Sequence, residues 1–224
     1  MAHYSPSILM LQETRLAAPP TSSRHLRDYT VFSAHSPTES KRGLLLAVSK
    51  SVPVVRFEEV MVVSGSVLII RAICTPPLQD LLLVNYHGQS VMEDTDRLDC
   101  ILATLSRFPK LLHIVGGDFN MALSNSEIQL LESGSYLPGN CRSSLSTFMR
   151  HGQLVCGKYR TSPISRYDWS RLSTVRPSAL DLILLSSTNI KAIDTTETLS
   201  SFVGSDHIPV RLSLNIAACI RPIR

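Results

Sequence analysis

Short apolar runs separated by polar turns dominate the hydrophobic pattern of this chain and predict a protein rich in β-strands. We expect strands at residues 8–11, 29–33, 43–48, 54–63, 66–73, 81–84, 111–115, 179–185 and 208–214. The two runs on either side of Ser64-Gly65 are typical of a hairpin. All of these runs are far shorter than the roughly 18 apolar residues of a membrane span, so no transmembrane helix is expected.

Helical periodicity is found in three places. The clearest helix spans about residues 94–107, where one apolar stripe is maintained. The spacing from Ser124 to Glu127 is that of a capping box and opens a short second helix, and a third is expected around Phe148. Strands separated by few helices, in an order that is not strictly alternating, predict an α/β (α+β) sandwich of mixed sheets.

A carboxylate and a carboxamide follow one of the predicted strands directly. Leu111–Val115 is expected to be a buried strand, and Gly116-Gly117 then let the backbone turn at its end. In an extended segment Asp118 and Asn120 share one face, while Phe119 points into the core. Sites of α/β proteins tend to lie at such carboxyl ends of strands. Taken alone, the same residues are equally compatible with an ordinary Gly-Asp-Asn turn.

Other polar residues stand at strand ends or inside strands, where a hydrophobic core does not favour them. The full set is Glu13, Tyr86 or His87, Asp118 with Asn120, Asp181, and Asp206 with His207. Buried carboxylates are costly unless they are paired, hydrogen-bonded or bound to a cation. An acid-rich cluster with one histidine and no cysteine suits a hard, oxygen-liganded ion such as Mg²⁺, with Mn²⁺ as a substitute. Such an ion, next to Asn and His side chains that donate hydrogen bonds to a phosphate, suits phosphodiester hydrolysis.

Simpler interpretations of these residues stay open from the sequence alone. Glu13 is also explained as a solvated glutamate at a strand end, and Asp206-His207 as a helix cap or turn pair. Asp181 is harder to explain in this way, because an unpartnered carboxylate inside an apolar strand is expensive. Residues 158–176 combine several basic and aromatic side chains with a single acid, Asp168. They suit either a solvated loop or a surface that contacts phosphates and stacks on an unpaired base.

Composition narrows the class of protein but not its function. The chain of 224 residues is 44% hydrophobic and 18% charged, which is typical of a soluble globular protein. Its N-terminus lacks a basic region followed by an apolar stretch, so no signal peptide is expected. Five widely spaced cysteines without a Cys-x-x-Cys pair indicate reduced thiols in an intracellular compartment and argue against zinc. A net charge of +4 mildly favours an anionic partner.

Four short motifs together resemble a known superfamily. They are Gln12-Glu13-Thr14, Gly117-Asp118-Phe119-Asn120, Leu180-Asp181-Leu182-Ile183-Leu184 and Ser205-Asp206-His207-Ile208-Pro209-Val210. Their order and rough spacing are those of the endonuclease/exonuclease/phosphatase superfamily. Within it the chain is most similar, over roughly residues 7–216, to the apurinic-type endonuclease domain of non-LTR (LINE-like) retrotransposons. The resemblance implies one domain over residues 1–224, built as a four-layered α/β sandwich of two mixed β-sheets packed face to face with helices outside.

The resemblance also implies a set of functional residues. The catalytic set would be Asp118, Asn120, Asp181, Asp206, His207 and Tyr86, with His87 as the other candidate for the family's tyrosine. Glu13 and Asp206 would serve the metal. The DNA contacts would come from Arg15, Asn120, Arg160, Arg166, Trp169, Arg171 and Ser205.

Each catalytic residue has a role implied by the family. Asp118 would orient or deprotonate the attacking water, or assist the leaving oxygen, and Asn120 would hold the scissile phosphate. Asp206 would help the metal or water network. Asp181 would orient His207, which would donate to a phosphate oxygen. A carboxylate suits that task because it fixes the imidazole tautomer and favours the protonated form beside an anion.

The implied function is a Mg²⁺-dependent DNA endonuclease that leaves a 3′-hydroxyl for target-primed reverse transcription. The reverse transcriptase would lie elsewhere on a longer polyprotein, and the domain would act in the nucleus as a monomer. Alternatives with the same fold are an apurinic-site repair nuclease, an RNA deadenylase-like enzyme, and a phosphatase of phosphoinositides or sphingomyelin. A truncated remnant that only binds nucleic acid is the alternative without catalysis.

The chain departs from the family's pattern in several places. It lacks the first strand, which carries a metal-supporting Asn, and most of the first helix, so we expect an exposed sheet edge or a gap in the core. Gly88-Gln89 replaces the usual continuation after the family's tyrosine. Asp168 stands where it would repel a DNA phosphate, unless it turns toward an arginine. Val155-Cys156 falls where an Asp often follows the second helix.

Overall fold

The structure is a computed structural model that describes residues 5–15, 24–35, 43–88, 95–121, 123–132, 137, 143–157, 180–199, 207 and 209–220. Its strands are β1 (Ile8–Leu11), β2 (Tyr29–His35), β3 (Gly43–Ser49), β4 (Val54–Val63), β5 (Val67–Cys74), β6 (Leu81–His87), β7 (Leu112–Asp118), β8 (Leu154–Cys156), β9 (Asp181–Ser186), β10 (Ile193–Thr198) and β11 (Val210–Leu214). Its helices are α1 (Thr95–Arg107), α2 (Asn125–Glu132) and α3 (Ser144–His151), with short 3₁₀ turns η1 (Arg24–Leu26), η2 (Ser187–Ala192) and η3 (Ile216–Cys219).

One mixed sheet of six strands forms the centre of the molecule, in the order β4-β5-β6-β7-β9-β8. Strands β6 and β7 run parallel, joined through α1, and the other neighbouring pairs are antiparallel. The predicted hairpin around Ser64-Gly65 is the β4–β5 pair. The parallel pair places the carboxyl ends of β6 and β7 at the same edge of the sheet, and this arrangement positions the site described below.

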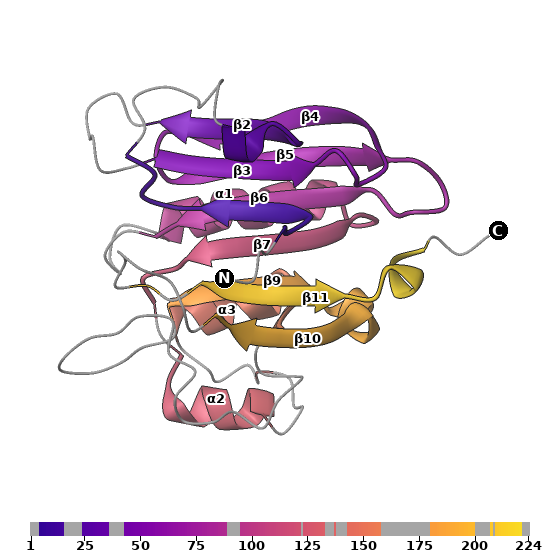
Figure 1. Cartoon of the computed structure of the whole chain (residues 1–224). Helices are drawn as coiled ribbons and strands as arrows, with labels where there is room; N and C mark the ends of the chain where they lie inside the picture. Colours follow the sequence, from indigo (N-terminus) through magenta and orange to yellow (C-terminus); the bar gives the residue numbers. More distant parts are fainter. Residues whose placement is uncertain are drawn as a thin grey trace.

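A second layer covers one face of this sheet (Figure 1). It consists of a three-stranded sheet, β1-β3-β2, and a two-stranded sheet, β10-β11, both antiparallel. Within the described ranges β1 pairs only with β3 and β11 only with β10, so each keeps one edge outside any ladder. The residues buried between the layers come from both, for example Leu46 of β3 and Leu83 of β6.

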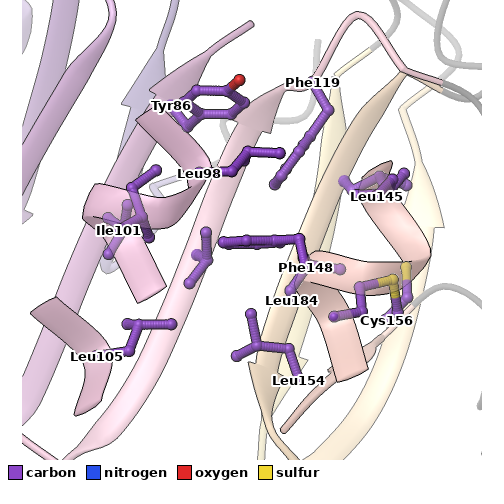
Figure 2. Packing of buried hydrophobic residues seen from close by; sticks show 14 of the residues in the cluster. Tyr86, Leu98, Ile101, Leu105, Phe119, Leu145, Phe148, Leu154, Cys156 and Leu184 are labelled. Atoms are coloured by element: carbon purple, nitrogen blue, oxygen red, sulfur yellow. The ribbon is translucent and has the colours of Figure 1, made fainter. Parts of the chain in front are cut away.

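The α-helices of the described residues pack on the opposite face of the six-stranded sheet, where they form a second buried cluster. Figure 2 shows this packing, in which Leu98 and Ile101 of α1 and Phe148 of α3 meet the side chains of β6 and β9. The predicted α/β sandwich is therefore confirmed. Within the described ranges, α-helices cover the six-stranded sheet and the second layer carries none.

Two helices are linked by one buried glutamate. Glu127 of α2 accepts hydrogen bonds from the backbone N–H and the hydroxyl of Ser124 at 2.8 and 2.9 Å, which confirms the capping box. Its other carboxylate oxygen accepts from the hydroxyl of Ser143, the N-cap of α3, at 2.9 Å. The side chain of Glu127 therefore joins the amino-terminal ends of α2 and α3.

The main corrections to the predicted elements concern strand length. Strand β7 continues through Gly116-Gly117 to Asp118, so the two glycines lie inside the strand and do not turn the chain. Gly117 has φ +149°, and a Cβ there would lie 1.8 Å from the carbonyl oxygen of Tyr86, so the close approach of β6 requires glycine. Strand β6 likewise continues to His87.

Two strands were not predicted. Strand β8 has only three residues, and β10 has the mostly polar sequence Ile-Asp-Thr-Thr-Glu-Thr, so neither shows a clear period of two. Asp181 is the first residue of β9 and does not lie in its interior. None of the described helices has both the length and the apolar character needed to cross a membrane.

Candidate active site

Three polar side chains occupy neighbouring positions across the six-stranded sheet. Strand register pairs His87 with Asp118 and Asp118 with Asp181. Side chains alternate along a strand, and residues four positions away, Ile114 from Asp118 and Leu83 from His87, lie in the cluster between the layers. The three polar groups therefore face the second layer, at the edge where β6 and β7 end and β9 begins.

His207 completes this row, although it lies 26 residues from Asp181 in sequence. Its Nδ1 atom lies 2.8 Å from Oδ2 of Asp181, and its Nε2 atom lies 3.9 Å from Oδ2 of Asp118. The carboxylates are mostly buried and the imidazole is about a quarter exposed. One nitrogen is thus held by a carboxylate while the other faces a second carboxylate, which is the arrangement predicted for an oriented histidine.

The environment of Asp118 disfavours its charge. Burial raises the pKa of this carboxyl group above its usual value of 3.8, and the negative charge of Asp181 raises it further. The backbone N–H of Asn120 and the nearby His207 and His87 lower the pKa of Asp118, but these effects are the smaller ones. A carboxyl group with a raised pKa takes and releases a proton more readily near neutral pH than an ordinary aspartate does.

Asn120 is near Asp118 for a different reason than the sequence predicted. Strand β7 ends at Asp118, and Asn120 has φ +49°, so the two side chains do not share an extended face. The backbone N–H of Asn120 instead donates to Oδ1 of Asp118 at 2.9 Å, as in an Asx turn, and its side-chain amide donates to the Gly88 carbonyl at 2.8 Å. Phe119 lies in the core between them, as predicted.

Glu13 approaches the site from the second layer. It follows β1 with φ +50°, and its Oε1 atom lies 3.7 Å from Nε2 of His87. The Glu13 side chain is 55% exposed, whereas that of His87 is 7% exposed. Arg15, two residues further on, is exposed and also has a positive φ of 51°. The carboxylate of Glu13 is therefore open to solvent on one side and next to a buried imidazole on the other.

A buried asparagine ties Glu13's strand to the central sheet, and sequence reasoning missed it. Asn85 of β6 is fully buried and donates from Nδ2 to the carbonyls of Leu11 at 3.1 Å and Leu45 at 2.9 Å. Its Oδ1 accepts from Nε2 of Gln12 at 2.6 Å. The signal was present, because Asn85 interrupts an apolar run just as Asp181 does, but a strand was expected to end before it.

The described structure brings together Glu13, Asp118, Asn120, Asp181 and His207, but not Tyr86. The Tyr86 ring packs on the helix side of the sheet, with its centroid 5.1 Å from that of Phe119 (Figure 2). His87, the other candidate, is the residue that faces Asp118. The predictions for Asp206, Ser205, Arg160, Arg166, Trp169 and Arg171 fall outside the described residues.

The site has a donor set that fits a divalent cation. One ligand atom each from Asp118, Asp181 and His207 lies within 4.8 Å of the others. Oxygen and imidazole ligands of this kind suit divalent ions such as Mg²⁺ and Mn²⁺ better than soft ions. The exposed Glu13 carboxylate approaches His87 and is not part of this group.

Comparisons with known proteins agree with this fold. A model of the Endonuclease/Exonuclease/phosphatase family matches residues 1–207. Among solved structures, AP endonuclease LMAP from Leishmania major is 17% identical, with a TM-score of 0.72 over 92% of this chain and 78% of that one. The endonuclease domain of TRAS1, a telomere-specific non-LTR retrotransposon, is 17% identical, with a TM-score of 0.67 over 94% of this chain and 86% of that one. No curated protein matches the sequence.

Proposed function

The chain belongs to the endonuclease/exonuclease/phosphatase family, and from this premise we propose that it is a divalent-metal-dependent DNA endonuclease. It would hydrolyse a phosphodiester bond, leave a 3′-hydroxyl, and so prime reverse transcription by an enzyme encoded with it in a non-LTR retrotransposon. Its place of action would be the nucleus. The observation that carries the proposal is the row Asp181–His207–Asp118, with separations of 2.8 and 3.9 Å.

The Asp181–His207 pair supports a contact to the scissile phosphate. With Nδ1–H donated to Asp181, the imidazole ring is fixed and Nε2 points toward Asp118. A phosphate placed between the layers would receive a hydrogen bond from the imidazolium Nε2–H. Such a bond to an oxygen that gains negative charge during the reaction stabilises the transition state more than the ground state.

Asp118 is the group best placed to move a proton. It lies next to Nε2 of His207, and its raised pKa brings it closer to the working range of a general base. In a direct in-line attack, Asp118 takes a proton from water as the water oxygen bonds to phosphorus. The bond between phosphorus and O3′ breaks, and the departing oxygen takes up a proton to become the 3′-hydroxyl. No covalent enzyme intermediate is formed.

A bound cation would be held at Glu13, or else by the set Asp118, Asp181 and His207, where it would take the place of the proton on Nε2 of His207. It would neutralise charge on the phosphate oxygens and on the leaving oxygen. We propose Mg²⁺, with Mn²⁺ able to replace it.

The DNA strand would lie across the exposed side of this row. Arg15 is exposed two residues after Glu13 and is suited to a backbone phosphate, as are the basic residues between 158 and 176. A net charge of +4 favours this binding, which would weaken with added salt.

The test is nicking of supercoiled plasmid by the purified chain with Mg²⁺, with EDTA, and by the variants Asp118→Asn and His207→Ala. Conversion to open circles that requires the metal and is lost in both variants supports the proposal. The matched control is Asp194→Asn, an exposed carboxylate on β10, which should nick like the wild type. A well-folded wild type that does not nick would contradict the proposal and favour a remnant that only binds nucleic acid.

A second substrate separates the proposal from its nearest alternative, an apurinic-site repair nuclease. A linear duplex with one abasic site is compared with the same duplex without it. Cleavage confined to the abasic site would favour repair, whereas equal cleavage of intact DNA supports the retrotransposon type of activity.

A further inference from the structure

His87 has a position that the proposed reaction leaves unexplained. It ends β6, is 5% exposed, and lies beside Asp118 in the parallel register. Its Nε2 atom lies 3.7 Å from Oε1 of Glu13. The imidazole is therefore near two carboxylates that belong to different layers of the protein.

The ring of His87 lacks the hydrogen bonds that normally accompany burial. Its Nδ1 atom is buried without a partner, and 3.7 Å is too long for a hydrogen bond from Nε2 to Glu13. Buried His113 also has an Nδ1 without a partner, but its Nε2 bonds the Phe108 carbonyl at 2.8 Å. A buried imidazole that makes no hydrogen bond to the described residues carries a free-energy cost. Since Nδ1 is enclosed in the protein, Nε2 is the ring nitrogen that faces Glu13 and is placed to bind a ligand.

We propose that His87 is a direct ligand, through Nε2, of a divalent cation that Glu13 also binds, and that this ligand favours Mn²⁺ over Mg²⁺. Ligand atoms lie about 2.1 Å from such an ion, so two of them are at most about 4.2 Å apart. The separation of Nε2 and Oε1, 3.7 Å, is inside this limit. The exposed side of Glu13 leaves room for water and for a phosphate oxygen as further ligands.

The preference follows from ligand chemistry. Carboxylate and water ligands suit Mg²⁺ and Mn²⁺ alike, but an imidazole nitrogen favours first-row transition ions over Mg²⁺. Removing the imidazole should therefore weaken Mn²⁺ binding by about tenfold or more and Mg²⁺ binding by less. The functional meaning of this site rests on the proposed function, although cation binding itself is measurable without any nicking.

The experiment uses pulsed electron paramagnetic resonance of Mn²⁺ added to the whole chain, which detects a directly bound imidazole through its ¹⁴N coupling. The variants are His87→Phe, which keeps a buried ring, and His207→Asn, which removes the other imidazole of the site. Dissociation constants for Mn²⁺ and Mg²⁺ are measured by calorimetry on the same samples, and circular dichroism checks folding. His87→Asn replaces His87→Phe if the latter does not fold.

The inference predicts ¹⁴N coupling in the wild type and in His207→Asn but not in the His87 variant, with the Mn²⁺ affinity reduced far more than the Mg²⁺ affinity. It is overturned if bound Mn²⁺ shows no coupling in the wild type, if coupling persists without His87, or if it disappears in His207→Asn. Coupling without plasmid nicking would leave the inference standing and reject the proposed function. Metal-dependent nicking without coupling would reject the inference and leave the proposed function standing.

Discussion

His207 is held by Asp181 at 2.8 Å through one ring nitrogen and faces Asp118 at 3.9 Å through the other. The first contact fixes which nitrogen is free to act. Asp181→Asn should therefore reduce the nicking rate by about 10²-fold or more, because the imidazole loses both its orientation and the neighbouring charge. The rate under saturating metal is the measurement, and DNA binding by the variant should stay close to that of the wild type. An unchanged rate would show that the pair is only structural.

The raised pKa of Asp118 predicts a specific pH dependence of activity. If this carboxylate takes a proton from water, nicking should decline on acidification at a higher pH than an ordinary aspartate with a pKa of 3.8 would cause. The measurement is the nicking rate from neutral to acidic pH under single-turnover conditions. A profile that stays flat down to the ordinary range would contradict the role of Asp118 as a base.

The raised pKa of Asp118 also predicts that Asp118→Asn stabilises the protein at neutral pH. A carboxyl group whose folded pKa is raised favours folding below its unfolded pKa, and this contribution is lost as the pH rises through the folded pKa. At neutral pH the charged, buried Asp118 therefore opposes folding, and the amide removes that penalty. The melting temperature of the variant should exceed that of the wild type at pH 7, and the difference should shrink on acidification toward pH 3.8.

Much of the central fold could be predicted because its residues obey simple local patterns. The hairpin of β4 and β5 follows from two apolar runs around Ser64-Gly65, and the start of α2 follows from the capping box of Ser124 and Glu127. Strand β10 could not be found in this way. Its polar residues are extended because they pair with β11, and the local sequence of β10 does not predict this contact with another segment.

For the site, residue types were predicted better than residue geometry. Asp118, Asp181 and His207 were expected to converge, and they do. The choice between Tyr86 and His87 could not be made, because a one-residue change in strand register moves every side chain to the other face. The observed strand register places His87, and not Tyr86, beside Asp118. Gly117 was placed in a turn because the approach of the Tyr86 carbonyl depends on the neighbouring strand.

The close approach of the Tyr86 carbonyl to Gly117 makes Gly117→Ala strongly destabilising. The added Cβ would lie 1.8 Å from the Tyr86 carbonyl oxygen, and φ +149° is itself unfavourable for alanine. Backbone atoms of a central strand cannot yield as a side chain can, so we expect a loss of about 3 kcal/mol or more in the free energy of unfolding. Urea denaturation measures it. Gly152→Ala is the control, since its Cβ would meet only side chains, those of Leu154 at 3.0 Å and Leu102 at 3.2 Å, and it should cost much less.

The lowered pKa of Glu127 predicts that the protein loses stability in acid. Burial raises its pKa, but hydrogen bonds from the Ser124 backbone and from the hydroxyls of Ser146, Ser143 and Ser124 outweigh burial and hold the pKa below the usual 4.5. A lowered folded pKa stabilises the protein above pH 4.5, and this contribution is lost as the pH falls through the folded pKa. Glu127→Gln should therefore cost about 2 kcal/mol at pH 7 and less in acid. Asp99→Asn, at an exposed position of α1, should cost almost nothing.

The last prediction concerns the polar link between the layers. Asn85 holds the end of β1 through the Leu11 carbonyl and through Gln12, so it positions Glu13 without touching the site itself. Asn85→Ala should lower stability by about 2 kcal/mol, since two buried carbonyls lose their donor. It should also weaken binding of the divalent cation by about tenfold. Gln12→Leu removes only the bond to Asn85 Oδ1, so it should weaken cation binding with a smaller loss of stability than Asn85→Ala. If the two variants lower stability but bind the cation normally, Asn85 is a packing residue and Glu13 finds its position without it.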